Sequence, residues 1–132
     1  MSTTQLKKII LVVEDEAPLQ KAIKIKLESN NFKVVTARKV TQAIHMLKDL
    51  GQIDVIWLDH YLLGKENGLD FVAEVKNNDE WKHIPIFVIS NTASQDKVTT
   101  YIRLGIDKYY TKADFRLEQI INDIKESLNK RE

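Results

Sequence analysis

The sequence contains no cysteine, two prolines and four glycines among its 132 residues. Without cysteine, disulfide bonds, thiolate metal sites and cysteine nucleophiles are all excluded. No apolar run approaches the roughly 20 residues that a helix needs to span a bilayer. The N-terminal residues also lack the apolar segment of a signal peptide. We therefore expect a cytoplasmic protein that makes no membrane contact.

Charge of one sign is also missing, because 20 basic residues face 19 acidic ones and the net charge is +1. This balance gives no reason to expect nucleic-acid binding. The length is typical of one domain, and we expect a single domain over residues 1–132 with a core of about residues 7–128. Any output must then come from this domain itself.

Apolar runs and amphipathic stretches alternate five times along the chain, which predicts five strand–helix units. The expected strands cover residues 9–13, 32–36, 54–58, 86–89 and 107–111, and the expected helices cover residues 18–29, 40–50, 69–76, 98–104 and 117–128. Runs without polar alternation are typical of strands buried on both faces of a parallel sheet. The prediction is an α/β fold with a doubly wound, five-stranded parallel sheet in the order 2-1-3-4-5, as in flavodoxin-like proteins. We expect Asp114 to cap the last helix, and Trp81 to pack while remaining partly exposed.

Polar residues with distinct chemistry follow four of these strands. Glu14 and Asp15 follow the first strand, Asp59 the third, Ser90 ends the fourth and Lys112 follows the fifth. Since the carboxyl ends of parallel strands form the binding crevice of such folds, we expect these side chains to meet in one pocket.

The chemistry of this set favours phosphoryl transfer. Carboxylates as close as Glu14, Asp15 and Asp59 would repel one another, and a magnesium ion removes the conflict while leaving positions open for a phosphate. Ser90 can donate to a phosphate oxygen, and Lys112 can neutralise charge. An aspartate in line with a phosphorus atom can act as the nucleophile.

The chain resembles the CheY-like receiver domain of two-component response regulators over nearly its whole length. The likeness is carried by the strand-end residues above together with the stretches 105–109 (Gly-Ile-Asp-Lys-Tyr) and 112–115 (Lys-Ala-Asp-Phe). It implies a switch that accepts a phosphoryl group from a histidine kinase or a histidine phosphotransfer protein. The expected output is to a downstream protein effector through the fourth helix, fifth strand and fifth helix.

The resemblance also implies a role for each matching residue. Asp59 would be the phosphoacceptor. Mg²⁺ would be held by Asp15, Asp59 and the backbone carbonyl of Tyr61, with Glu14 acting directly or through water. Ser90 would bond the phosphoryl group, Lys112 would pair with it, and Tyr109 would be the switch aromatic, although Tyr110 competes for that role.

Four features depart from the family pattern. Leu63 and Ala113 stand where the family often has proline, Asn91 is larger than the usual residue, and the loop over residues 64–68 is one residue longer. These departures concern kinetics and loop geometry, because no reactive group is lost. We also expect the bulky Tyr61 to hinder attacking water and slow loss of the phosphoryl group.

Three other functions remain open at this point. A haloacid-dehalogenase-type phosphatase also forms an aspartyl phosphate, but it needs a second aspartate where this chain has Tyr61. A flavodoxin-like flavin carrier needs a phosphate-cradling loop after the first strand, where the acidic residues would repel phosphate. A degenerate receiver would bind partners without phosphorylation. The presence of every reactive residue argues against this alternative.

Overall fold

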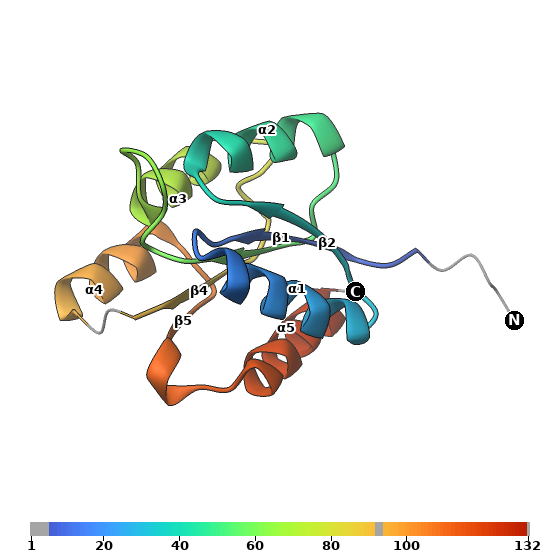
Figure 1. Cartoon of the computed structure of the whole chain (residues 1–132). Coiled ribbons are helices and arrows are strands. Elements are labelled where there is room, and N and C mark those ends of the chain that lie inside the picture. Colours follow the sequence, from blue (N-terminus) through green and yellow to red (C-terminus); the bar gives the residue numbers. More distant parts are fainter. Residues whose placement is uncertain (1–5, 92–93, 132) are drawn as a thin grey trace, which may run out of the picture.

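The computed structural model describes residues 6–91 and 94–131, and Figure 1 shows a central sheet with helices on both faces. Its strands are β1 (Ile9–Val13), β2 (Lys33–Ala37), β3 (Val55–Leu58), β4 (Ile86–Ser90) and β5 (Lys108–Thr111). Its helices are α1 (Ala17–Ser29), α2 (Val40–Leu50), α3 (Gly68–Lys76), α4 (Gln95–Leu104), the short 3₁₀ helix η1 (Lys112–Asp114) and α5 (Leu117–Arg131). The predicted α/β fold is confirmed.

The five strands are parallel and lie in the order β2-β1-β3-β4-β5, as predicted. The register pairs Val13 with Leu58, the last residues of β1 and β3. It also pairs Ser90 with Thr111 at the ends of β4 and β5. The residues that follow these strands therefore lie side by side at the edge of the sheet formed by the carboxyl ends of the strands.

Each face of the sheet carries its own apolar core, because the strands are apolar on both sides. Helices α2, α3 and α4 cover one face, where Leu11, Leu58 and Phe71 are fully buried. Helices α1 and α5 cover the other, where Trp57 and Ile124 are buried. Both cores end at the edge where the polar residues gather, so that edge rests on a rigid support.

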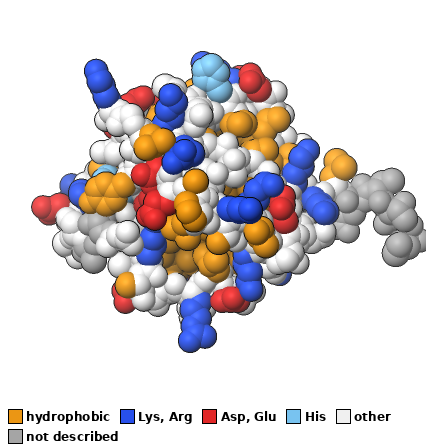
Figure 2. Space-filling view, in the orientation of Figure 1, with side chains coloured by type: hydrophobic (Ala, Val, Ile, Leu, Met, Phe, Trp, Pro, Cys, Tyr) orange, Lys and Arg blue, Asp and Glu red, His pale blue; other side chains and the backbone are white. Residues whose placement is uncertain are grey.

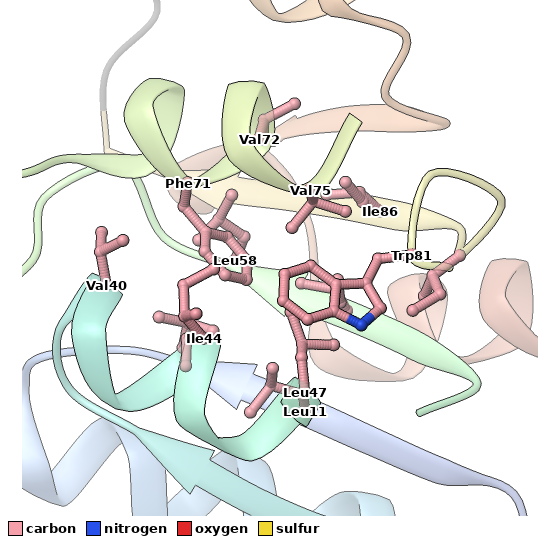
Figure 3. Packing of buried hydrophobic residues seen from close by; sticks show 14 of the residues in the cluster. Leu11, Val40, Ile44, Leu47, Leu58, Phe71, Val72, Val75, Trp81 and Ile86 are labelled. Atoms are coloured by element: carbon pink, nitrogen blue, oxygen red, sulfur yellow. The ribbon is translucent and has the colours of Figure 1, made fainter. Parts of the chain in front are cut away.

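The tryptophan that follows α3 is part of the core, which corrects one expectation from sequence. Trp81 is 9% exposed, and its indole points between Val75, Leu47 and Leu11 (Figure 3). Polar neighbours in the sequence suggested partial exposure. The turn after α3 instead folds back so that the ring covers the end of the core.

The start of α5 corrects a second expectation. Asp114 ends η1, and α5 begins three residues later at Leu117. The residue before the helix is Arg116, whose backbone N–H donates to Gln119 Oε1 at 3.0 Å. Asp114 therefore does not cap α5, because Phe115 and Arg116 lie between it and the first residue of the helix. None of the described helices has the length and apolar character needed to cross a membrane.

Candidate functional site

Three acidic side chains converge at the carboxyl edge of the sheet, as the sequence predicts. One carboxylate oxygen from each of Glu14, Asp15 and Asp59 lies within 4.8 Å of the others. Figure 2 shows acidic side chains gathered toward the side on which β1 ends in Figure 1, with basic side chains nearby. Glu14 and Asp59, which are 45 positions apart in the sequence, thus belong to one acidic cluster.

The carboxylate of Asp59 is oriented by contacts to both of its oxygens. The side chain is buried, and its backbone N–H donates to the Val13 carbonyl at 2.9 Å. Oδ1 accepts from the backbone N–H of His60 at 2.8 Å, while Oδ2 lies 3.5 Å from Lys112 Nζ. The Asp59 carboxylate is therefore held between a backbone amide and an ammonium group.

Lys112 connects two carboxylates in this cluster. It begins η1 directly after β5, and its ammonium lies 3.1 Å from Glu14 Oε1 as well as 3.5 Å from Asp59 Oδ2. Burial lowers the pKa of Lys112, but the negative charges and hydrogen bonds of Asp59 and Glu14 outweigh this effect and raise it. Lys112 is therefore a cation at neutral pH, shared by two anions.

The ionised form of the Glu14 carboxyl is disfavoured in the folded protein. Desolvation by burial raises its pKa to about 7, with a further contribution from the charge on Asp59. Its contacts with the Glu16 amide and with Lys112 only partly oppose this. One ammonium does not balance three clustered carboxylates, and a hard divalent cation with oxygen ligands would. The donor set thus fits the predicted Mg²⁺.

Asp15 is held in place by a residue that sequence reasoning missed. Arg38, in the turn between β2 and α2, donates to the Asp15 carbonyl from Nε at 2.9 Å and from Nη2 at 2.7 Å. Both bonds go to the backbone, which leaves the Asp15 carboxylate for the acidic cluster. No local sequence pattern predicts that Arg38 bonds the Asp15 carbonyl, because an arginine in a turn is usually a solvated charge.

The hydroxyl of Ser90 is the one buried side-chain polar atom without a hydrogen-bond partner among the residues that the structure describes. It lies at the end of β4, fully buried. Burial raises the pKa of Tyr109, and an interaction with Ser90 partly offsets this increase. An unsatisfied buried hydroxyl is costly, and an incoming phosphoryl oxygen would satisfy it.

Tyr61 stands at the outer rim of the site, where its side chain is 49% exposed. Lys97 of α4 donates to the Tyr61 hydroxyl at 3.1 Å and lies 5.2 Å from the centre of the ring. Lys97 is a second site neighbour that the sequence did not reveal. The predicted roles of the Tyr61 carbonyl as a metal ligand and of Tyr109 as a switch remain predictions.

Comparison with known proteins shows the family to which a chain with this fold and this acidic cluster belongs. Residues 10–125 match the model of the response regulator receiver domain. The chain therefore belongs to the receiver-domain family of two-component response regulators. Members of this family act as regulatory switches rather than as enzymes that turn over a substrate.

Two kinds of relative stand out within the family. The phosphate regulon transcriptional regulatory protein PhoB of Escherichia coli strain K12 is 31% identical over 116 residues, covering 88% of this chain and 49% of PhoB. The chain thus spans about half the length of that relative. The crystal structure of the phosphorylated cyanobacterial phytochrome response regulator RcpA matches with a TM-score of 0.78 at 28% identity, covering 91% and 90% of the two chains. The Mn²⁺-bound response regulator Rcp1 matches with a TM-score of 0.78 at 25% identity, covering 89% and 91%.

Proposed function

We propose that this protein is a phosphorylation-controlled signalling switch whose phosphoacceptor is Asp59. The observation that carries the proposal is the pair of contacts on the Asp59 carboxylate, with the His60 amide on Oδ1 and the Lys112 ammonium near Oδ2. Phosphoryl transfer needs positioning and charge neutralisation more than covalent help from the protein. These contacts supply both to a carboxylate that is otherwise surrounded by acidic groups.

Glu14, Asp15 and Asp59 would hold Mg²⁺, with the Tyr61 carbonyl as a further ligand. The ion would supply charge neutralisation between the acidic cluster and a phosphate. Two related structures support this assignment, since RcpA is described as phosphorylated and Rcp1 as bound to Mn²⁺.

In the proposed transfer, an Asp59 oxygen forms a bond to the phosphorus as the bond between phosphorus and the donor breaks. A phosphorylated histidine on a kinase or phosphotransfer protein would be the donor, and its imidazole nitrogen the leaving group. Lys112 would neutralise the phosphoryl oxygens, and the Ser90 hydroxyl would gain the acceptor that it lacks. Tyr109 interacts with Ser90. When Ser90 shifts toward the phosphoryl group, the Tyr109 ring would move toward the protein interior and so change the face formed by α4, β5 and α5.

A downstream protein effector would read that face, and the location would be cytoplasmic. The Lys97–Tyr61 contact supports slow loss of the phosphoryl group, because it holds a bulky side chain two residues from Asp59, where it would hinder attacking water. Phosphate loss from Tyr61→Ala should then be faster than from the parent protein. Loss at the same rate or slower would contradict this part of the proposal.

The proposal is tested by incubating the protein with Mg²⁺ and acetyl phosphate and measuring the intact mass. We expect an acid-labile increase of one phosphoryl group that requires Mg²⁺ and disappears in Asp59→Asn. Asp54→Asn is a matched control, because Asp54 lies before β3 and bonds to the Ile9 amide at the opposite edge of the sheet. A parent protein that gains no phosphoryl group would contradict the proposal.

A further inference from the structure

The residue after the phosphoacceptor, His60, is held by hydrogen bonds at its backbone N–H, its carbonyl and ring Nδ1. His60 is 3% exposed, and its backbone N–H donates to Asp59 Oδ1 at 2.8 Å. Its carbonyl accepts from the Gly68 amide at 2.9 Å. Its ring Nδ1 is 2.6 Å from the hydroxyl of Tyr101, which is completely buried. Because the N–H that orients the acceptor belongs to this anchored residue, whatever fixes His60 also fixes Asp59.

The anchor on the ring comes from α4. Tyr101 and Lys97 stand one turn apart on that helix and therefore lie on the same face. Tyr101 bonds His60, and Lys97 bonds the hydroxyl of the next residue, Tyr61. One face of α4 thus holds two consecutive residues of the loop that follows the acceptor.

The contact is an uncharged hydrogen bond in a closely packed space. Burial lowers the pKa of His60 and raises the pKa of Tyr101, so both groups are neutral at ordinary pH. A side chain at Gly68 would collide with the Tyr101 hydroxyl and make tight contacts with the backbone of Asp59 and His60. The ring of Tyr101 also packs against Tyr109, with ring centres 5.7 Å apart. The hydroxyl of Tyr101 therefore has little freedom to leave His60.

We propose that His60 and Tyr101 are positioning residues for the phosphoacceptor, and that their hydrogen bond ties α4 to Asp59. The bond holds the His60 amide toward Oδ1 and so keeps Oδ2 turned toward Lys112. Linkage between equilibria works in both directions, so a partner that binds one position of α4 more tightly also changes the free energy of the phosphorylated form of Asp59. This inference rests on the function proposed above.

The first test removes one oxygen atom from each of two tyrosines. Tyr101→Phe deletes the hydroxyl that bonds His60 and keeps the ring against Tyr109. Tyr110→Phe is the matched control, because its hydroxyl bonds Asp123 Oδ2 at 2.6 Å on the other face of the sheet. With Mg²⁺ and acetyl phosphate, we expect Tyr101→Phe to be phosphorylated roughly three- to tenfold more slowly than the control, the scale of one lost hydrogen bond.

Two further variants separate positioning from mere stability. In His60→Asn the side-chain amide offers both a donor and an acceptor in place of Nδ1, so this variant should keep most of the parent's rate, whereas His60→Leu should lose as much as Tyr101→Phe. The double variant His60→Leu/Tyr101→Phe should be no slower than the slower single variant, because both remove the same bond. The backbone amide proton of residue 60, which reports its bond to Asp59, should shift in NMR spectra of Tyr101→Phe and stay in place in Tyr110→Phe.

The outcomes distinguish this inference from the function on which it rests. A parent protein that gains no phosphoryl group overturns both. A parent that is phosphorylated, with Tyr101→Phe and His60→Leu at the control rate and an unmoved residue 60 amide, overturns the positioning role alone. If Tyr101→Phe fails to fold, the comparison of His60→Asn with His60→Leu decides by the same criterion.

Discussion

At the scale of single residues, the site is defined by an excess of negative charge that the protein itself does not balance. Glu14 and Asp59 share the ammonium of Lys112, and Asp15 adds a third carboxylate. Burial makes each uncompensated charge more costly. The cluster therefore favours a hard divalent cation bound between its carboxylates.

Metal-free protein should lose stability through Glu14 as the pH rises. The pKa of Glu14 is about 7 in the folded protein and 4.5 without the fold, so between these values the folded state binds more protons. The stabilising contribution is complete below pH 4.5 and is lost as the pH approaches 7, at a cost of at most about 3 kcal/mol.

Urea unfolding at a series of pH values, with a chelator present, measures this effect. Glu14→Gln cannot titrate at this position. Between pH 4.5 and pH 7 we therefore expect its free energy of unfolding to fall less than that of the parent. Parallel pH profiles for the two proteins would show that Glu14 has no raised pKa.

At the scale of elements, the loop that follows Asp59 is held by contacts with two helices, α3 and α4. Asn67 and Asp70 begin α3 with a capping box, in which each side chain bonds the other's backbone amide. Gly68, which follows Asn67, is buried, and its backbone N–H donates to the His60 carbonyl. Helix α4 closes the other side through Tyr101. Small changes at the start of α3 should therefore be felt at Asp59.

Replacement of Gly68 by alanine tests this fit. The added methyl group would meet the Tyr101 hydroxyl and lie 3.0 Å from the Asp59 carbonyl and 3.1 Å from the His60 Cα. We expect a loss of roughly 1–3 kcal/mol in the free energy of unfolding, as for other overpacked sites.

Gly68→Ala in the Tyr101→Phe background is the informative comparison. Without the hydroxyl the alanine should cost less than it does in the parent, because only the backbone contacts remain. Equal costs in the two backgrounds, measured by urea unfolding, would mean that the tyrosine hydroxyl does not crowd Gly68.

The elements were largely predictable from sequence because their signals are local. Apolar runs predicted the strands. Gly51 and Gly105, in left-handed conformations, mark the ends of α2 and α4. The strand-end positions of Asp59 and Lys112 then followed from the parallel order. The contacts of Arg38 and His60 could not be predicted, because they join segments whose relative placement depends on turn geometry and packing.

At the scale of the whole molecule, one sheet supports two cores, and neither core stands without it. Trp57 belongs to the face covered by α1 and α5, and Trp81 to the face covered by α2 and α3. Both tryptophans are nearly inaccessible, at 1% and 9% exposure. Disruption of either face removes the support for the strand ends that carry the site.

The shared sheet predicts a single cooperative unfolding transition, as is usual for a domain of this size. In Trp57→Phe the remaining tryptophan reports on one core, and in Trp81→Phe on the other. Within each variant, tryptophan fluorescence and circular dichroism should give the same urea midpoint. Fluorescence that changes before circular dichroism in one variant would show that its core melts independently.

The most direct test of the central claim identifies the residue that carries the phosphoryl group. Protein treated with Mg²⁺ and acetyl phosphate is reduced with borohydride, which converts an aspartyl phosphate to homoserine, and the peptides are sequenced by mass spectrometry. The proposed site predicts homoserine at position 59 and nowhere else. Homoserine at another acidic residue, with Asp59 unmodified, would contradict the account.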